Sequence, residues 1–286
     1  MSPSRSFHAD GWSRTPRSYE QCRPRVLVEH GSLAVVRSFD ELVAEAEAAD
    51  VSGWGFGWLN DRATEERPPW SYVTILGERL AQVGSALDLD TGGGEVLDEA
   101  PTLPPRMVVT EGWAPNAAQA RDRLGPRGVE VVEVRPGERL PFDDASFELV
   151  TSRHPVAPDW PEIHRVLVPG GHYVAQHVGP ASVFELIEFF LGPLPENRKG
   201  RDPVTEMAAA RDAGLEVVDL RTARCRIELF DVGAVVWLLR KCVWWVPDFS
   251  VARYRDRLVE LDAQLRGGVP FVAHSTRHLV DARRPD

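Results

Sequence analysis

The stretch from Asp88 to Glu95 is the part of this sequence best suited to bind a small charged molecule, because it combines carboxylates with three consecutive glycines. When a strand ends in an acid and continues into a glycine-rich turn and a helix, the backbone can approach a bound nucleotide where side chains would collide. A glycine turn is often only a connection, so the pattern alone leaves the function open. The candidate cofactor-binding residues in this loop are Asp88, Asp90, Thr91, Gly92 and Gly94.

A second acid follows about twenty residues further on, where the hydroxyl groups of a nucleotide ribose need an acceptor. Glu111 occupies this position at the end of a predicted strand, and Gly112 and Trp113 come directly after it as further candidates for the cofactor. The indole of Trp113 is suited to cover an adenine ring, although it is equally well explained as a core residue. For Glu111 the alternative is an ordinary acid at the start of a helix or on the surface.

Two histidines stand at the ends of later predicted strands, in the segments Ser152-Arg153-His154 and Gln176-His177. Ligands of open α/β sheets bind beyond the carboxyl ends of the strands, and a histidine there has a pKa suited to removing a proton from an acceptor. We favour His154 as the catalytic base and keep His177 as a second candidate. The alternatives are a structural histidine bonded to backbone for His154 and a packed turn residue for His177. Ser152 and Arg153 are expected to contact the cofactor.

Alternating strand and helix patterns must position these residues, and such alternation is typical of a parallel sheet covered by helices on both faces. The segments with strand character are residues 85–88, 106–110, 129–134, 147–152, 172–177, 215–220 and 271–283. The segments with helical character are residues 39–49, 72–83, 94–99, 114–124, 160–167, 181–191, 204–213 and, with a break at 247–248, 231–265. Residues 192–203 are rich in proline, glycine and charge, which indicates a surface linker.

The most specific pattern is the run ERLPFDDASFELV at residues 138–150. It resembles the segment that leads into the fourth strand in the methyltransferase type 11-like group of class I S-adenosylmethionine (SAM)-dependent methyltransferases, with Glu148 in place of the usual aspartate. The run EIHRVLVPGG at residues 162–171 resembles the helix and turn before the fifth strand of that group, and DLDTGGGE at residues 88–95 resembles its motif I. Together the matching segments cover about residues 85–178.

This resemblance implies a Rossmann-like three-layer α/β sandwich, with a seven-stranded, mostly parallel sheet, an antiparallel last strand and a helical cap. It also implies SAM as the cofactor and S-adenosylhomocysteine as the product. Two positions depart from the pattern of the group. Asp90 stands where the first glycine of motif I usually falls, and Arg135-Pro136-Gly137 lacks the acid that often contacts the adenine amine. A backbone group near Gly137 is expected to substitute for that acid.

A dinucleotide-dependent dehydrogenase is the competing interpretation of the glycine loop. Its glycines would cradle a pyrophosphate at a helix N-terminus. Asp90 and Glu95 would then place carboxylates beside the phosphates, whereas the neutral-to-cationic SAM tolerates them better. The sequence therefore favours SAM.

The expected division is an N-terminal extension with lid helices over residues 1–84, a SAM-binding core over 85–230, a helical substrate cap over 231–268 and the final core strand over 269–286. The lid and cap are unusually aromatic, which predicts an apolar wall for an aromatic acceptor. For each of these residues the alternative is hydrophobic core or a contact in a homo-oligomer. The candidate substrate-binding residues are Trp54, Trp58, Trp237, Trp244 and Trp245, with Phe249 beside them.

Charge and cysteine content narrow the range of partners. The 43 acidic and 33 basic residues give a formal net charge of -10, which disfavours nucleic acid unless positive charge gathers on one face. Three scattered cysteines offer neither a close metal-ligand pair nor a disulfide framework, and they suit a reducing cytoplasm. Neither a signal peptide nor a membrane span is predicted. No metal site is predicted either, because His274 and His278 share one side of a strand but lack a third ligand.

The sequence therefore predicts an enzyme of secondary metabolism that methylates a small aromatic or heterocyclic metabolite, for example an indole-like one, at O, N or C. Two alternatives stay open. An RNA or protein methyltransferase with the same core would need a basic face, for which arginines between residues 253 and 284 are available. A SAM-fold protein without methyl transfer, such as a cyclase or a binding module, is the other.

Overall fold

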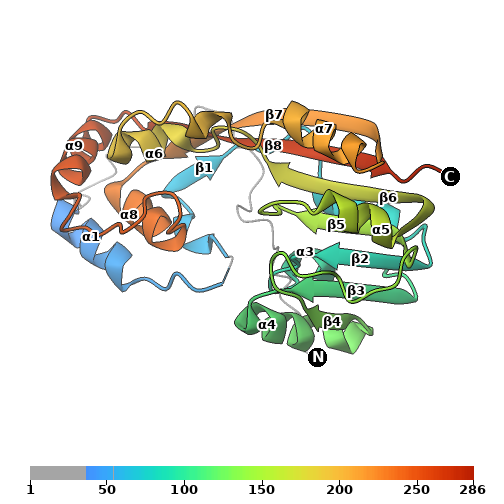
Figure 1. Ribbon diagram of the computed structural model, residues 1–286. Coiled ribbons are helices and arrows are strands. Elements are labelled where there is room, and N and C mark those ends of the chain that lie inside the picture. Colours follow the sequence, from blue (N-terminus) through green and yellow to red (C-terminus); the bar gives the residue numbers. More distant parts are fainter. Residues whose placement is uncertain (1–36, 54) are drawn as a thin grey trace. The chain divides into compact units, whose positions relative to one another are not determined.

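A computed structural model describes residues 37–53 and 55–286 of the chain (Figure 1). The strands in these residues form an eight-stranded sheet with the order β1-β7-β8-β6-β5-β2-β3-β4. This confirms the predicted Rossmann-like class, with a mostly parallel sheet and an antiparallel last strand. The sheet has one strand more than the seven expected, because the short β1 (Ala63–Glu65) pairs antiparallel with β7 (Glu216–Leu229).

The other strands are β2 (Ser85–Leu89), β3 (Arg106–Glu111), β4 (Glu130–Glu133), β5 (Phe147–Arg153), β6 (Leu167–Val178) and β8 (Phe271–Arg283). The α-helices are α1 (Phe39–Ala48), α2 (Tyr72–Leu80), α3 (Glu95–Asp98), α4 (Ala114–Leu124), α5 (Trp160–Val166), α6 (Phe184–Leu191), α7 (Pro203–Asp212), α8 (Val232–Lys241) and α9 (Arg255–Arg266). Short 3-10 helices are η2 (Gly57–Leu59), η3 (Gly125–Arg127) and η4 (Asn197–Lys199). None of the helices in the described residues has the length and apolarity to cross a bilayer.

The chain divides into two compact units, each assembled from separate stretches of sequence. Unit 1 contains the described residues up to 66, together with 183–194 and 226–274. Unit 2 contains 67–182, 195–225 and 275–286, so that β7 and β8 contribute residues to both units. The domain boundaries expected from the sequence at 84, 230 and 268 stay a prediction.

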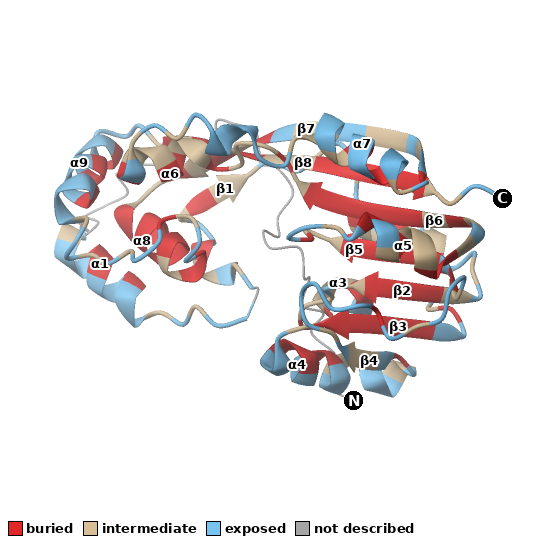
Figure 2. Ribbon diagram, in the orientation of Figure 1, coloured by how far each residue is buried: buried red, intermediate tan, exposed pale blue. Residues whose placement is uncertain are grey.

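In unit 2 the parallel strands are covered on both faces, because successive residues of a strand point to opposite sides. On one face, Leu87, Val150 and Tyr173 pack with apolar side chains of α5 and α7. On the other face, Ala86 and Leu149 pack with α2, α3 and α4. Figure 2 shows the buried strands β2, β3, β5 and β6 between these layers. This arrangement is the predicted three-layer sandwich.

The register of unit 2 brings the carboxyl ends of its central strands to one edge of the sheet. β2 pairs in parallel with β3 and β5, which places Asp88 beside Val109 and Thr151. β5 pairs in parallel with β6, which places Arg153 beside Gln176. The loops that follow β2, β3, β5 and β6 therefore meet at the same edge.

Unit 1 has a helical core. Ser38 caps α1: its side chain accepts the Glu41 N–H, and the Glu41 carboxylate accepts the Ser38 N–H, which closes a capping box. The apolar stripe of α1 packs in one cluster with side chains of α6, α8 and α9. Almost every residue of α8 is buried, as expected for a helix that is apolar on most of its faces.

Several boundaries differ from those expected. β7 continues to Leu229 instead of ending at 220, because the arginine-rich stretch that follows 220 stays extended and reaches β1. The helical stretch expected over 231–265 is interrupted over 242–254, and not only at 247–248. β6 already begins at Leu167, before the expected 172. α6 begins at Phe184 instead of 181, because Val183 has a left-handed φ of 63°.

Candidate functional site

The glycine loop connects β2 to α3 and has three residues in the left-handed backbone region. Asp90, Gly92 and Gly94 have φ values of 55°, 64° and 79°. Aspartate is one of the few side chains that adopt this conformation at small cost, which explains how Asp90 replaces a glycine of motif I. The loop is anchored to β3, because the Thr91 N–H donates to the carbonyl oxygen of Thr110 at 3.0 Å.

Two of the predicted glycines are required by packing within unit 2. A Cβ atom at Gly94 would lie 2.7 Å from a side-chain carbon of Leu124 on α4. A Cβ atom at Gly112 would lie 2.8 Å from the carbonyl oxygen of Val134. Both approaches are too close for a side chain, so the loops after β2 and β3 close in this way only with glycine at these positions.

Three carboxylates, here called the loop carboxylates (Asp88, Asp90 and Glu111), surround the glycine loop. Asp88 is buried and accepts a 2.6 Å hydrogen bond from the hydroxyl of Thr151. Burial raises the pKa of Asp88 to about 6, although hydrogen bonds from Thr151 and Thr91 oppose the rise. Burial and the nearby charge of Glu111 raise the pKa of Asp90. Because buried like charges repel, a cation bound at the loop would relieve the strain between these acids.

Glu111 links β3 to the glycine loop. Its Oε2 accepts the Gly92 N–H at 2.9 Å, and its Oε1 accepts the Trp113 N–H at 2.8 Å. Each oxygen keeps a second lone pair, so these bonds leave room for the predicted ribose hydroxyls. The side chain is not the surface acid of the alternative interpretation, because Glu111 is only 8% exposed.

Arg123 on α4 neutralises the remaining acid of the loop. Its guanidinium group pairs with Glu95 at 2.9 Å and donates to the carbonyl oxygen of Gly93. Glu95 is therefore already paired within unit 2. The negative charge that a ligand meets at this loop comes from the loop carboxylates.

Trp113 and Gly137 belong to the loops after β3 and β4. Trp113 is 60% exposed, which excludes the alternative that it is a core residue. Gly137 has φ 81°, and a Cβ atom there would meet open space. The turn around it is closed by Glu138, whose carboxylate accepts the Arg135 N–H at 3.1 Å. An exposed indole and an uncrowded turn are compatible with the predicted adenine contacts, which stay a prediction.

Ser152 and Arg153 at the end of β5 differ in whether a side-chain hydrogen-bond donor is still available for a ligand. The Ser152 hydroxyl donates to the carbonyl oxygen of Leu89 at 3.0 Å and so joins β5 to the end of β2. The Nε atom of Arg153 is buried and has no hydrogen-bond partner in the described residues. A buried N–H without an acceptor is costly unless water or a ligand supplies one. Arg153 is therefore the better candidate of the two for a ligand contact.

His154 follows β5 in the left-handed region, with φ 60°, and its N–H donates to the Gln176 carbonyl oxygen at 2.7 Å. A chain of hydrogen bonds fixes its ring. The indole N–H of Trp70 can only donate, and it donates to Oε1 of Gln176 at 2.8 Å. The amide nitrogen of Gln176 therefore faces Nε2 of His154, at 3.2 Å, and donates to it. His154 consequently carries its proton on Nδ1.

This tautomer bears on the chemistry open to His154. Its Nε2 lone pair is already in use, and its Nδ1 is a donor. Burial, together with the positive charges of Arg277 and Arg153, holds the pKa of His154 well below its ordinary value, so the ring is neutral at pH 7. The predicted role as a base stays a prediction, and the geometry favours a role as a hydrogen-bond donor.

His177, the second candidate base, has both ring nitrogens engaged. Its Nε2 is 2.9 Å from the Tyr173 hydroxyl, and its Nδ1 is 2.9 Å from Oε2 of Glu206 on α7. The same oxygen is 2.7 Å from Nε2 of His278 on β8. Burial raises the pKa of Glu206, but the hydrogen bonds with the two histidines outweigh it and lower the pKa to about 2. Glu206 is therefore ionised between two imidazoles, an arrangement that no local sequence pattern signals.

The predicted substrate tryptophans of unit 1 serve different purposes there. Trp237 is 2% exposed and stacks on Trp58, with ring centroids 5.6 Å apart. Trp245 packs partly against the same core, whereas Trp244 is 58% exposed. Trp54 lies outside the described residues. Core packing thus accounts for Trp237, as the alternative interpretation held, and substrate binding by the tryptophans stays a prediction.

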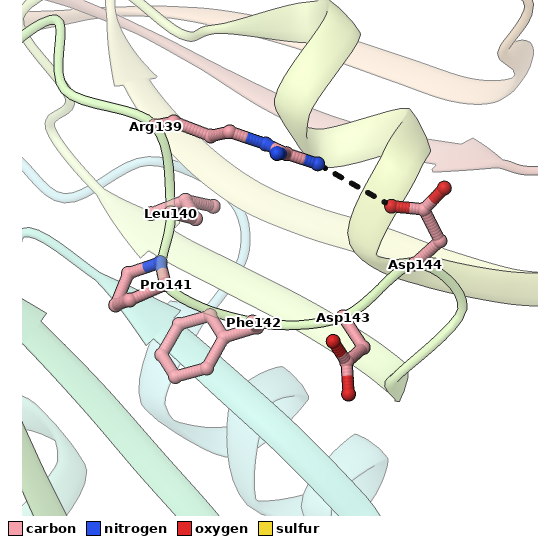
Figure 3. Close-up of a pocket in the computed structure, with 6 residues that line it drawn as sticks. All are labelled: Arg139, Leu140, Pro141, Phe142, Asp143 and Asp144. Atoms are coloured by element: carbon pink, nitrogen blue, oxygen red, sulfur yellow. Dashed lines mark ion pairs between the residues drawn. The ribbon is translucent and has the colours of Figure 1, made fainter.

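The run at residues 138–150 is held by α5 and supports the fold of unit 2. Arg165 donates to the carbonyl oxygens of Leu140 and Phe142 at 3.0 and 2.7 Å, and it pairs with Asp144 at 2.9 Å. Figure 3 shows the surface hollow at this turn, where Arg139 reaches toward Asp144. The segment that carries the family resemblance is therefore scaffold, while the loop carboxylates and strand ends carry the candidate chemistry.

Solved structures share this fold. A protein from Bacillus halodurans C-125 that is assigned as a methyltransferase is 19% identical and covers 76% of this chain and 100% of its own, with a TM-score of 0.55. The YcgJ protein from Bacillus subtilis is 14% identical and covers 75% of this chain and 98% of its own, with a TM-score of 0.52. A functionally unknown protein from Deinococcus radiodurans R1 is 17% identical and covers 78% and 90%, with a TM-score of 0.53. At these identities the likeness shows the fold alone.

Residues 87–175 match the Methyltransf_11 family model, whose description is methyltransferase domain. This span contains the loop carboxylates, the run at 138–150 and the strand end Ser152-Arg153-His154, and it stops just before Gln176. The chain therefore contains a class I SAM-dependent methyltransferase domain, and the predicted cofactor is the one that such a domain uses. No curated protein matches the sequence.

Proposed function

We propose that the protein transfers a methyl group from SAM to a small molecule bound beyond the carboxyl ends of β5 and β6 in unit 2. The observation that carries this proposal is the set of loop carboxylates around the glycine loop. SAM carries a sulfonium and an ammonium group, and both are cations. Three acids that pair with no arginine of the described residues favour such a ligand over the pyrophosphate of a dinucleotide.

The residues of this chain have two tasks in the proposed reaction. When bound, SAM supplies an electrophilic methyl group that passes to a lone pair of the acceptor. The glycine loop and the loop carboxylates hold the cofactor, while His154 and Arg153 orient the acceptor through N–H donors. Holding two reactants in line is the main contribution to rate that a site of this kind makes.

The acceptor is proposed to bring its own nucleophilic lone pair. Of the two histidines predicted as bases, neither has an unengaged acceptor nitrogen: His154 accepts from Gln176, and both nitrogens of His177 are in use. A phenolate, a thiolate or a pyridine-type ring nitrogen fits this requirement, because each reacts through a free lone pair. An electron-rich heterocycle that reacts at carbon would in addition have to release its ring proton to water. An aromatic acceptor is supported by the sequence of unit 1 and fits the small-molecule proposal.

Two measurements test this function. Calorimetry with SAM is expected to show one site per chain, and the absence of binding would overturn the proposal. Incubation with methyl-labelled SAM and a panel of phenols, thiols and indoles is expected to give a labelled small molecule. An acceptor converted without label would instead indicate the non-methylating alternative, and label in added RNA or protein would indicate a macromolecular acceptor.

A further inference from the structure

A second cluster of polar side chains in unit 2 is separate from the loop carboxylates. His177 near the end of β6, Glu206 on α7 and His278 on β8 present nitrogen and oxygen atoms that all lie within 4.8 Å of one another. Nδ1 of His177 and Nε2 of His278 approach the same oxygen, Oε2 of Glu206, at 2.9 and 2.7 Å. Both histidine side chains are almost fully buried, and that of Glu206 is 19% exposed.

The pairing of β6 with β8 brings the two histidines together. His177 and His278 are direct partners in this antiparallel pair. Every second residue of a strand points to the same face, so His177 shares the face of Tyr173, and His278 shares the face of Val280. This is the face that packs with α7, and Glu206 in the first turn of that helix meets both rings. The cluster is thus built on two strands and one helix and does not rest on a surface loop.

Two imidazoles and one carboxylate are a ligand set for a divalent transition-metal ion. In zinc hydrolases and in non-haem iron enzymes the same set leaves positions open for water or substrate. Bonds of about 2.0 to 2.2 Å to Zn²⁺ place the ligand atoms of a tetrahedral site about 3.3 Å apart. The separations of 2.7 and 2.9 Å therefore need to widen by about half an ångström to admit the ion, and the two histidine nitrogens, which lie within 4.8 Å of each other, need to approach toward the same 3.3 Å.

The surroundings of the His177 ring suit such an ion. The Tyr173 hydroxyl, 2.9 Å from Nε2 of His177, can accept a hydrogen bond from an Nε2–H group, which leaves the Nδ1 lone pair for a metal ion. Nδ1 of His278 is buried and has no hydrogen-bond partner in the described residues. Among the described residues, the hydrogen bond of that ring is made through Nε2, the atom that faces Glu206. The indole of Trp160, 6.1 Å from the His177 ring, adds an apolar wall.

We propose that His177, Glu206 and His278 bind one divalent transition-metal ion of the Zn²⁺ type. The position on the partly exposed Glu206 side is left for water or for an anionic oxygen. The competing explanation is a carboxylate that holds two histidines through hydrogen bonds alone. Metal binding is measured without SAM, so the outcome is independent of the proposed methyl transfer.

The metal content of the full chain gives the first test. After expression with added zinc and removal of any affinity tag, mass spectrometry is expected to find about one ion per chain. The metal-free protein should then bind Zn²⁺ and Co²⁺ with the same stoichiometry in calorimetry, and the Co²⁺ form should show the visible absorption of a tetrahedral site. A protein that contains no metal and gives no heat with either ion would overturn the proposal.

Two variants distinguish a specific Zn²⁺ site at His177, Glu206 and His278 from nonspecific binding of Zn²⁺ by histidine side chains. Glu206→Gln keeps the size of the side chain but removes its charge, and it is expected to weaken Zn²⁺ binding by about tenfold or more. His172→Asn is the matched control, because His172 lies on the same strand but pairs with Asp281 at 2.7 Å. Zn²⁺ should raise the melting temperature of the wild type and of His172→Asn equally, and that of Glu206→Gln by less. Equal Zn²⁺ affinity in Glu206→Gln and the wild type would overturn the proposal even if metal were present.

Discussion

The two ends of the strands in unit 2 contain similar residues in different electrostatic settings. At the carboxyl end, Glu111 accepts two backbone N–H groups and lies close enough to Asp90 to raise the pKa of that residue. At the amino end, Glu148 also accepts two backbone N–H groups, from Gly84 and Ser85, at 2.7 and 2.9 Å. Both glutamates therefore close a turn, but only Glu111 does so beside other buried acids.

The histidines of β6 repeat this contrast. His172, toward the amino end, pairs with Asp281, which also pairs with Arg79, so charge is balanced there. At the carboxyl end, the Nε of Arg153 and the Nδ1 of His278 are buried without a partner in the described residues. Polar residues occur at both ends of the strands. Unpaired acids and buried polar atoms without a partner in the described residues distinguish the carboxyl end. This is the end at which open α/β sheets bind ligands.

The largest contrast is expected between Gly94→Ala and Gly170→Ala, since both glycines have a positive φ. At Gly94 the new Cβ atom would lie 2.7 Å from a carbon of Leu124, so strain and overpacking of about 3 kcal/mol should displace the loop and lower SAM affinity by about a hundredfold. At Gly170 the nearest atom is an Asp286 oxygen at 3.2 Å, and only stability should fall, by about 1 kcal/mol. Calorimetry and urea unfolding measure both effects. Equal SAM affinity in the two variants would remove the distinction between the ends.

The glutamate pair gives the next effect. Glu111→Gln should lower SAM affinity by about tenfold or more, because it removes the charge and one acceptor for the ribose hydroxyls. Glu148→Gln should leave SAM affinity unchanged while lowering the free energy of unfolding by about 1 kcal/mol, because it weakens only the bonds to Gly84 and Ser85. Isothermal calorimetry of both variants decides this. A loss of SAM affinity in Glu148→Gln would show that glutamate substitutions lower SAM affinity by destabilising the fold, and not by removing a contact with SAM.

A smaller effect is expected at the histidines. Asparagine tolerates the left-handed backbone of His154, so His154→Asn should fold and should lower kcat by about tenfold, while the SAM dissociation constant stays unchanged. His172→Asn should alter neither. If His154 acts as a donor, the wild-type kcat/KM profile should show no ionisation of His154 near pH 6.5, because its pKa lies well below that value. If the kcat/KM profile instead shows an ionisation near pH 6.5 that disappears in His154→Asn, His154 acts as a general base.

The smallest effect follows from the pKa of Asp88, which burial raises to about 6. The carboxyl group loses its charge as the pH falls through this value, so the affinity for the cationic SAM should drop about fourfold between pH 7.5 and 5.5. The free energy of unfolding of the protein without SAM should change with pH in the opposite direction. The raised pKa of Asp88 stabilises the fold at low pH, and this contribution is lost as the pH rises through 6. Calorimetry across this range should show the drop in wild type and none in Asp88→Asn. A drop of the same size in Asp88→Asn would assign it to another group.

The glycine loop and the succession of strands and helices along residues 85–178 can be predicted from the sequence because their signals are local. The acids and glycines of residues 88–95 lie next to one another, and period-two and helical patterns mark the elements around them. Asp90 shows the limit of such signals. Its departure from glycine is visible in the sequence, whereas its left-handed φ and its proximity to Glu111 require the fold.

The His177 cluster could not be predicted, because it depends on long-range register. Spacing along the chain pairs His278 with His274, yet in the structure His274 lies beside Glu185, and His278 faces His177 across the β6–β8 pair. The hydrogen bonds that fix the His154 ring likewise join residues far apart in the sequence, because Trp70 donates to Gln176 and Gln176 donates to His154. No periodicity within a segment reports contacts of this kind.

The shared last strand has a consequence for how the protein forms during synthesis. β8 contributes Phe271 and Ala273 to the core of unit 1, and Val280 and Ala282 to the core of unit 2. Neither core is complete until this strand has left the ribosome, which at about 5 to 20 residues per second leaves earlier apolar segments uncovered for many seconds. We therefore expect both units to finish folding together once β8 has emerged, and the nascent chain to depend on chaperones until then.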